Sequence, residues 1–157
     1  MLFHRHVVAG LFALGVLVGG AAGAAPLPGT ESLASKHGFD VLVERTEAAI
    51  KANGMGHLST ASASRGAKAR GVTIAGNAVV MVFRPDFAVR MLAASVDAGV
   101  EAPLRLYITE QPDGGTRLSW RRPSSVFAPY GVPGLDAMAA ELDPILARIA
   151  AQASGEP

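Results

Sequence analysis

The stretch LRLYITEQPDGGTRLSW, Leu104 to Trp120, alternates apolar and polar residues on both sides of a Gly-rich turn. A period of two predicts two strands that each have a buried face and a wet face, and the turn predicts that they pair as an antiparallel hairpin. The buried face is predicted to carry Leu104, Leu106, Ile108, Leu118 and Trp120. The wet face carries long polar side chains, among them Arg105, Tyr107, Arg117 and Arg121. This hairpin predicts a fold with an antiparallel sheet.

Two longer segments have helical periodicity. From Val41 to Asn53 the apolar residues fall on one stripe, and Asp40 is placed to cap this helix. A second helix is predicted from Gly134, with apolar spacing that continues over about five turns. Pro144 lies inside this segment, so either the helix kinks there or a new helix begins with Asp143 as its cap.

The shorter elements are predicted from composition. They are a strand at residues 36–40, a loop or a loop with one weak helical turn at 55–71, an interior strand at 77–83, a helix capped by Asp86 at 86–92, and an edge strand at Val126 and Phe127. The predicted order is β-α-β-β-α-β-β-α, which is typical of an α+β domain with a mainly antiparallel sheet. Met81, Met91 and Met138 are predicted to fill its core.

The N-terminus has the three parts of a secretory signal. Arg5 lies at the start, an apolar run extends from residue 7 to 23, and Ala22-Gly23-Ala24 offers small residues at a cleavage site. We therefore predict a signal peptide at 1–24, a flexible leader at 25–33, one domain at 34–153 and a disordered tail at 154–157. The protein would be periplasmic or secreted, with membrane contact only through the signal segment before cleavage; retention of that segment as an anchor is the alternative.

The composition excludes several classes of function. Cleavage would remove one of the 14 Lys and Arg residues and none of the 13 Asp and Glu residues, which leaves a neutral chain. A neutral protein lacks the basic surface that nucleic-acid binding needs. The chain has no Cys, which excludes disulfides, thiolate catalysis and Cys-ligated metals.

Three stretches of the chain resemble the domain of unknown function 302 family, a set of small bacterial and archaeal proteins. They are VVMVFRP (79–85) with RML (90–92), VEAPLRLYI (100–108), and DGGTRLSWRRP (113–123). The resemblance implies a curved antiparallel sheet with an early helix and a long C-terminal helix packed on one face. It also implies a homodimer with no established activity. Many family members have an Asp-His pair where this chain has Ala61-Ser62-Ala63, so no site is carried over.

The candidate ligand-binding residues are basic side chains around the 57–71 loop: His57, Arg65, Lys68, Arg70 and Arg84. Such side chains can form charge-assisted hydrogen bonds to an anion, and the alternative is a solvated loop. Met55 and His57 could together suit Cu(I), but we favour the alternative, which is an exposed His in a turn after a helix. We predict no catalytic residue, no metal site and no cofactor.

The wet face of the hairpin is the candidate partner surface, through Arg105, Tyr107, Arg117 and Arg121. Arg and Tyr are enriched at interfaces, although long side chains also cover solvated sheets. If this face forms a homodimer, Glu101 and Glu110 are the acids that could pair with the arginines. The predicted function is a non-enzymatic module that binds a small-molecule or anionic ligand, or a partner. The alternative is an enzyme with an unrecognised active site in the cleft near the 57–71 loop.

Overall fold

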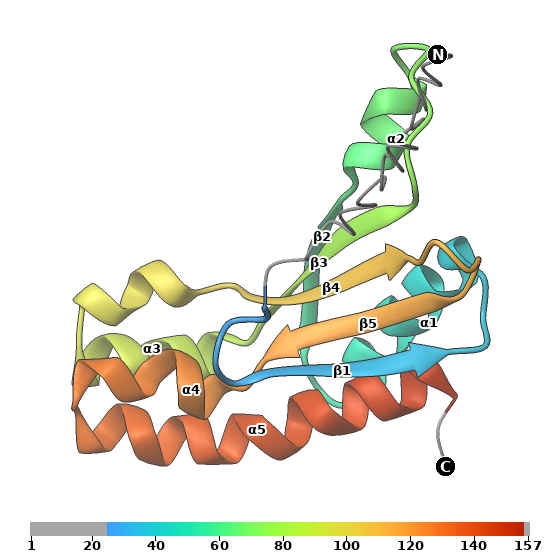
Figure 1. Ribbon diagram of the computed structural model, residues 1–157. Helices are drawn as coiled ribbons and strands as arrows, with labels where there is room; N and C mark the ends of the chain where they lie inside the picture. The colour runs from blue at the N-terminus through green and yellow to red at the C-terminus, as the bar shows by residue number, and fades with distance from the viewer. Residues whose placement is uncertain (1–24, 156–157) are drawn as a thin grey trace, which may run out of the picture.

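Five strands pair into one antiparallel sheet, and the main helices pack on one of its faces in the computed structural model, which describes residues 25–155 (Figure 1). The strand order is β1-β5-β4-β3-β2. The elements are β1 (Thr30–Ser35), α1 (Phe39–Ala52), β2 (Gly56–Ala61), α2 (Ala63–Lys68), β3 (Asn77–Phe83), α3 (Pro85–Ala94), η1 (Asp97–Glu101), β4 (Leu104–Glu110), β5 (Thr116–Arg121), α4 (Pro123–Phe127), η2 (Ala128–Tyr130) and α5 (Pro133–Ser154). The predicted α+β class and its order of main elements are confirmed.

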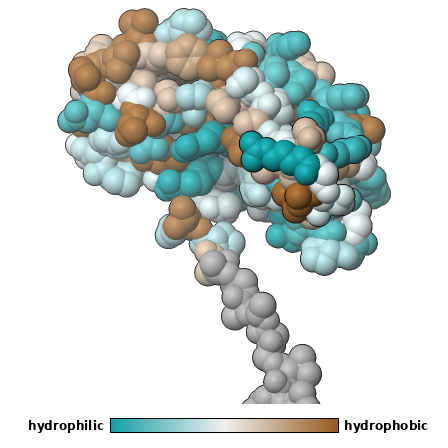
Figure 2. Space-filling view, turned by 90° about the horizontal axis from the view of Figure 1, so that it is seen from above, coloured by the Kyte–Doolittle hydropathy of each residue, from teal (hydrophilic) through white to brown (hydrophobic). Residues whose placement is uncertain are grey.

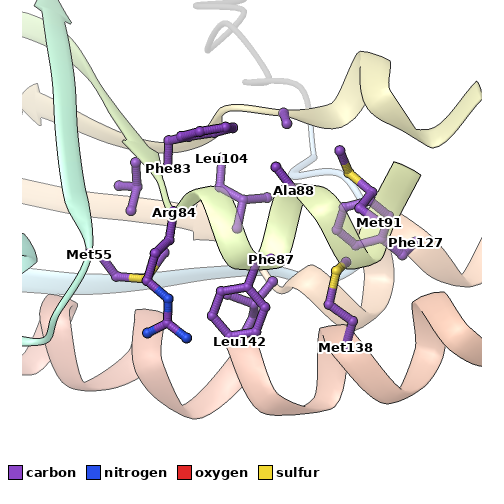
Figure 3. A pocket seen from close by; sticks show the side chains of 12 residues that line it. Met55, Phe83, Arg84, Phe87, Ala88, Met91, Leu104, Phe127, Met138 and Leu142 are labelled. Atoms are coloured by element: carbon purple, nitrogen blue, oxygen red, sulfur yellow. The ribbon is translucent and has the colours of Figure 1, made fainter. Parts of the chain in front are cut away.

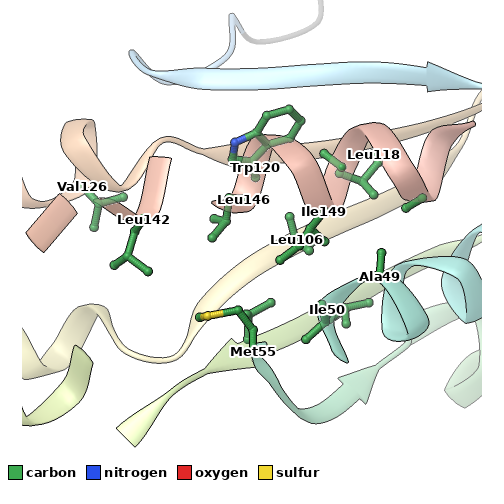
Figure 4. Packing of buried hydrophobic residues seen from close by; sticks show 14 of the residues in the cluster. Ala49, Ile50, Met55, Leu106, Leu118, Trp120, Val126, Leu142, Leu146 and Ile149 are labelled. Atoms are coloured by element: carbon green, nitrogen blue, oxygen red, sulfur yellow. The ribbon is translucent and has the colours of Figure 1, made fainter. Parts of the chain in front are cut away.

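The hairpin has the two faces that its sequence predicts. β4 pairs with β5 from Leu106–Trp120 to Glu110–Thr116. Leu106 and Leu118 are fully buried, and Trp120 is only 7% exposed. Figure 4 shows these three side chains packed in the same layer as residues of α5. The core therefore lies between one face of the sheet and the helices.

The two long helices also follow their sequence pattern. In α1 the buried residues include Leu42, Thr46 and Ile50, which lie on the predicted stripe. α5 runs unbroken through Pro144, so a second helix does not begin there. Asp143 caps α4 instead, because its carboxylate accepts a hydrogen bond from the Ser124 N–H at 2.9 Å.

The first strand lies earlier in the chain than predicted. β1 occupies Thr30–Ser35 and so overlaps the stretch 25–33 that was expected to be a flexible leader, whereas residues 36 and 37 form a bend before α1. The physical reason is that β1 pairs with the edge of β5 along its whole length, from Thr30–Arg121 to Ser35–Thr116. Backbone hydrogen bonds to an existing edge order a segment whose own apolar pattern is weak.

The segment 55–71 forms more structure than the predicted loop. β2 pairs with β3, with a bulge between His57 and Ser59, and α2 follows as a short helix. Ser62 caps α2, since its Oγ accepts a hydrogen bond from the Arg65 N–H at 3.2 Å. The β2–α2–β3 segment projects from the body of the molecule (Figure 1). The small and polar residues of β2 did not predict a strand. β2 is an edge strand that is held by backbone pairing with β3.

Four local predictions are corrected by the structure. Val126 and Phe127 belong to α4, because β1 already occupies the free edge of β5. Met81 points to the open face of the sheet, since it lies between buried Val80 and Val82 on β3. The backbone caps of α1 and α3 are Gly38 and Arg84 rather than Asp40 and Asp86, which lie within the first helical turns. At the other end of the chain, Ser154 is a buried residue of α5 and not part of a tail.

The helical end of the molecule presents an apolar surface. Exposed apolar side chains here are Val89 and Leu92 of α3, Val96 between the two helices, and Val100 of η1. Figure 2 shows hydrophobic residues gathered at the end where these elements lie. Within residues 25–155, no helix is both long and apolar enough to cross a membrane. The predicted signal peptide at 1–24 lies outside the described residues.

Candidate functional site

The sheet opens between β4 and β5 at the ends remote from their turn. The last residue pair between the two strands is Leu106–Trp120. One residue further along, Arg105 pairs with Met81 of β3, whereas Arg121 pairs with Thr30 of β1. The strands thus diverge here (Figure 1), and a hollow of about 290 Å³ lies at this point.

The hollow has an apolar lining because the divergence of the strands uncovers residues that otherwise face the core. Leu104 and Trp120 come from the inner faces of β4 and β5, and Val126 comes from α4. Val79 of β3 and Leu27 add apolar surface from the open side. Small-molecule sites are typically concave and apolar with a few polar groups, and their volumes start near 300 Å³.

Two guanidinium groups line the same hollow. Arg105 has no side-chain hydrogen bond or ion pair with any residue in the described range 25–155. In Arg121, Nη2 donates to the Ser125 carbonyl oxygen over 3.5 Å, and Nε is buried without a hydrogen-bond partner among the described residues. A buried donor without a partner costs about 1–3 kcal/mol. The hollow therefore holds positive charge and unused hydrogen-bond donors.

One acid faces these arginines. Glu101 lines the hollow, and its Oε1 accepts a hydrogen bond from the Tyr130 hydroxyl at 3.2 Å. Burial and this carboxylate raise the pKa of Tyr130 above its ordinary value. Two guanidinium groups and one carboxylate leave the hollow with one net positive charge.

A tight turn between Leu27 and Thr30 forms one rim of the hollow. The Thr30 N–H donates to the Leu27 carbonyl oxygen at 3.1 Å, which closes a turn around Pro28 and Gly29. Gly29 has a φ of 77°, as the third position of a type II turn requires. The Gly29 carbonyl oxygen accepts from the Arg122 N–H at 2.9 Å, so the turn is attached to the end of β5. Leu27 is held beside the arginines as a result.

The predicted partner-surface residues share the open face of the sheet. Arg105, Tyr107 and Arg121 line the hollow, together with the hydroxyl-bearing Ser119. Arg117 lies on the same face but outside the hollow, where it pairs with Thr109 and is exposed. The alternation in the sequence was sufficient to place these side chains on one face. The hollow between them had no signal in the sequence.

The predicted ligand-binding residues are distributed over two regions. Arg65 and Lys68 of α2 border a groove of about 570 Å³, which Phe39 of α1 and Glu110 of β4 also line. Arg65 is already paired with Asp40 at 3.0 Å, and Arg70 is exposed in the turn that follows α2. Arg84 lies at the opposite end of β3, so these basic residues form no common site.

Arg84 is held by its own neighbours. Its Nε and Nη2 donate to the two carboxylate oxygens of Asp86 at 2.7 and 2.9 Å. The guanidinium carbon also lies 4.2 Å from the centre of the Phe87 ring. The hydrogen bonds from Arg84 lower the pKa of Asp86. One donor edge and one face of the Arg84 guanidinium are therefore occupied by residues of α3.

His57 joins β2 to α1. The Thr60 hydroxyl donates to Glu47 Oε1 at 2.6 Å, and His57 Nε2 lies 2.9 Å from the same hydroxyl oxygen. Because the only hydroxyl proton points to the carboxylate, Nε2 must be the donor toward Thr60. His57 consequently cannot take a proton from Thr60 in this arrangement, and the three residues form a structural bridge.

The methionines beside Arg84 line a much smaller space. Figure 3 shows Met55, Met91 and Met138 around a pocket between β3, α3 and α5. Its volume is about 30 Å³, which leaves room for only one or two water molecules. Met91 and Met138 are buried core residues as predicted. No cluster of three His, Cys, Asp or Glu side chains suited to a metal occurs within residues 25–155.

Together these features define a two-layer α+β protein with one open sheet face and a cationic, apolar-lined hollow on that face. The family model described as "Domain of unknown function DUF302" matches residues 31–153, and the chain belongs to this family. The fold is also similar to the crystal structure of an uncharacterized conserved protein DUF302 from Bacillus stearothermophilus. That match has a TM-score of 0.73 and 21% identity, and it covers 81% of this chain and 99% of the other. No curated protein matches this chain.

Proposed function

We propose that this protein is an exported, non-enzymatic module that binds a small anion in the hollow between β4 and β5. One observation supports this most directly. Arg105 and Arg121 face one hollow without an ion-pair partner in residues 25–155, and Nε of Arg121 is buried with no acceptor. An anion in the hollow would accept charge-assisted hydrogen bonds from the other N–H groups of these two guanidinium groups.

Export is part of the proposal and rests on the sequence. The basic start, the apolar run and the small residues at Ala22-Gly23-Ala24 indicate cleavage after Ala24. Sequencing the N-terminus of the protein from the periplasm or the medium is expected to give Ala25 as the first residue. A chain that still begins with Met1 would show that the segment is retained.

A homodimer through the same face is the second candidate, because the long side chains of this face would cover a partner. The two acids that could pair with the arginines already accept hydrogen bonds from their own chain. Glu101 accepts from Tyr130, and Glu110 accepts from the Gly76 N–H at 2.9 Å. Arginines of two copies would repel one another across a two-fold axis unless those acids rearranged. This arrangement favours the anion, and sedimentation at several concentrations distinguishes a monomer from a dimer.

The experiment uses hexanoate as the probe and the single Trp of the chain as the reporter. Trp120 lines the hollow, so its fluorescence is expected to change on binding. Arg105→Gln and Arg121→Gln should each weaken binding about tenfold or more, since a hydrogen bond to a charged group contributes about 1.5–3 kcal/mol. Arg117→Gln is the matched control, because Arg117 lies on the same face outside the hollow. Absence of binding by both hexanoate and inorganic phosphate in the wild type, or equal binding in all three variants, would refute the proposal.

A further inference from the structure

The geometry points to an amphiphilic monocarboxylate, with one carboxylate and an apolar chain, as the ligand of the hollow. This inference rests on the proposed function and names the class of anion. It joins three observations: the net charge of the hollow, the shape of its donors and the apolar surface beneath them. Each of these narrows the choice of ligand.

The charge selects a monoanion. Arg105 and Arg121 contribute two positive charges, and Glu101 removes one. A dianion such as phosphate would leave an excess negative charge beside the Glu101 carboxylate. Phosphate sites also commonly use free backbone N–H groups at helix N-termini or in Gly-rich loops. The hollow is instead bordered mainly by strand residues, and Arg105 and Arg121 supply side-chain donors to it.

The donors suit a planar group. A guanidinium presents its N–H groups as a flat fork that matches the two oxygens of a carboxylate. Arg105 and Arg121 enter the hollow from strands on either side of the gap, so the two forks can approach one carboxylate from both sides. Ser119 and Tyr107 add hydroxyls on the open side, and the Ser119 hydroxyl is already shared with that of Ser32 at 2.8 Å.

The lining selects an apolar chain behind the carboxylate. Leu104, Trp120 and Val126 lie where the sheet has opened, and Val79 and Leu27 border the same space. A small inorganic anion would leave this surface in contact with water. Each methylene buried there is worth about 0.8 kcal/mol, which corresponds to about a fourfold gain in affinity.

The test is a series of probes: acetate, butanoate, hexanoate, octanoate, hexan-1-ol and inorganic phosphate, titrated at constant ionic strength. Affinity, read from Trp120 fluorescence and calorimetry, is expected to rise about fourfold per methylene until the chain outgrows the hollow. Hexanol and phosphate should each bind at least tenfold more weakly than hexanoate. Val79→Thr should reduce the affinity for octanoate several-fold and leave that for acetate unchanged. Val89→Thr, on the exposed face of α3, is its control.

The outcomes separate this inference from the proposed function. Equal affinity for acetate and octanoate, with binding still lost in Arg121→Gln, would overturn the amphiphile and leave an anion site. Phosphate that binds as tightly as hexanoate would do the same. Binding of hexanol equal to hexanoate, unaffected by either arginine substitution, would overturn both, as would the absence of binding by every probe. Circular dichroism of each variant confirms that it is folded before its affinity is compared.

Discussion

Replacement of Trp120 by Ala removes the largest side chain that the hairpin buries. Trp120 is 7% exposed, and truncation of a buried Trp to Ala costs about 3–5 kcal/mol. Because Trp120 also borders the hollow, water can enter the space that the indole leaves. We therefore expect a loss in the lower half of the range, about 3–4 kcal/mol. With a urea m-value of about 2 kcal/mol/M, the unfolding midpoint should fall by about 1.5–2 M.

The assay is urea unfolding followed by far-ultraviolet circular dichroism, since the variant lacks the fluorophore. Trp120→Phe keeps an aromatic ring in the site and should lose less. Arg117→Ala, on the wet face of the same strand, should change stability by no more than about 0.5 kcal/mol. The reasoning is wrong if Trp120→Ala behaves like Arg117→Ala, or if the native emission of Trp120 matches that of free Trp in water.

Two further predictions concern the rim of the hollow. Gly29→Ala should destabilise the protein by about 2–3 kcal/mol in urea, because φ is 77° and a Cβ would collide with a serine of α4. Gly54→Ala has a φ of 69° and open space around it, so it should lose only about 1 kcal/mol; equal losses would contradict the role of the collision. Tyr130 should ionise at a higher pH than an unfolded Tyr, because burial and Glu101 raise its pKa. The folded chain then holds this proton longer, so stability should decline as the pH rises past about 10. Tyrosinate absorbance in a Tyr107→Phe background measures this ionisation, and Glu101→Gln should lower the pKa part of the way; no change would remove Glu101 as a cause.

Some of the fold was predictable because its signals are local. The alternation around Leu106 and Trp120 predicted the hairpin and both of its faces, since side chains of a strand point alternately to opposite sides. The stripe that contains Leu42 and Ile50 predicted the buried face of α1. The same local periodicity placed Arg105, Arg117 and Arg121 on one side of the sheet.

The two edge strands were not predictable in this way. β1 (Thr30–Ser35) has one large apolar residue, Leu33, and β2 (Gly56–Ala61) consists mainly of small and polar residues. Both are ordered by hydrogen bonds to the backbone of a neighbouring strand, and backbone groups are the same whatever the side chain. β1 is ordered by its pairing with β5, which lies far along the chain, and β2 by its pairing with β3. The composition of β1 and β2 themselves therefore contains little information that would predict a strand.

The candidate site shows the same division. The amino-acid sequence by itself determined which long cationic side chains share the open face of the sheet. Successive side chains of a strand point to opposite faces, so every second residue lies on the same face. The tertiary structure decided that Arg105 and Arg121 border a hollow while Arg117 does not. That difference arises because pairing between β4 and β5 stops at Leu106–Trp120, where each strand follows a different neighbour. The extent of pairing depends on the twist and packing of the whole sheet, which no local pattern encodes.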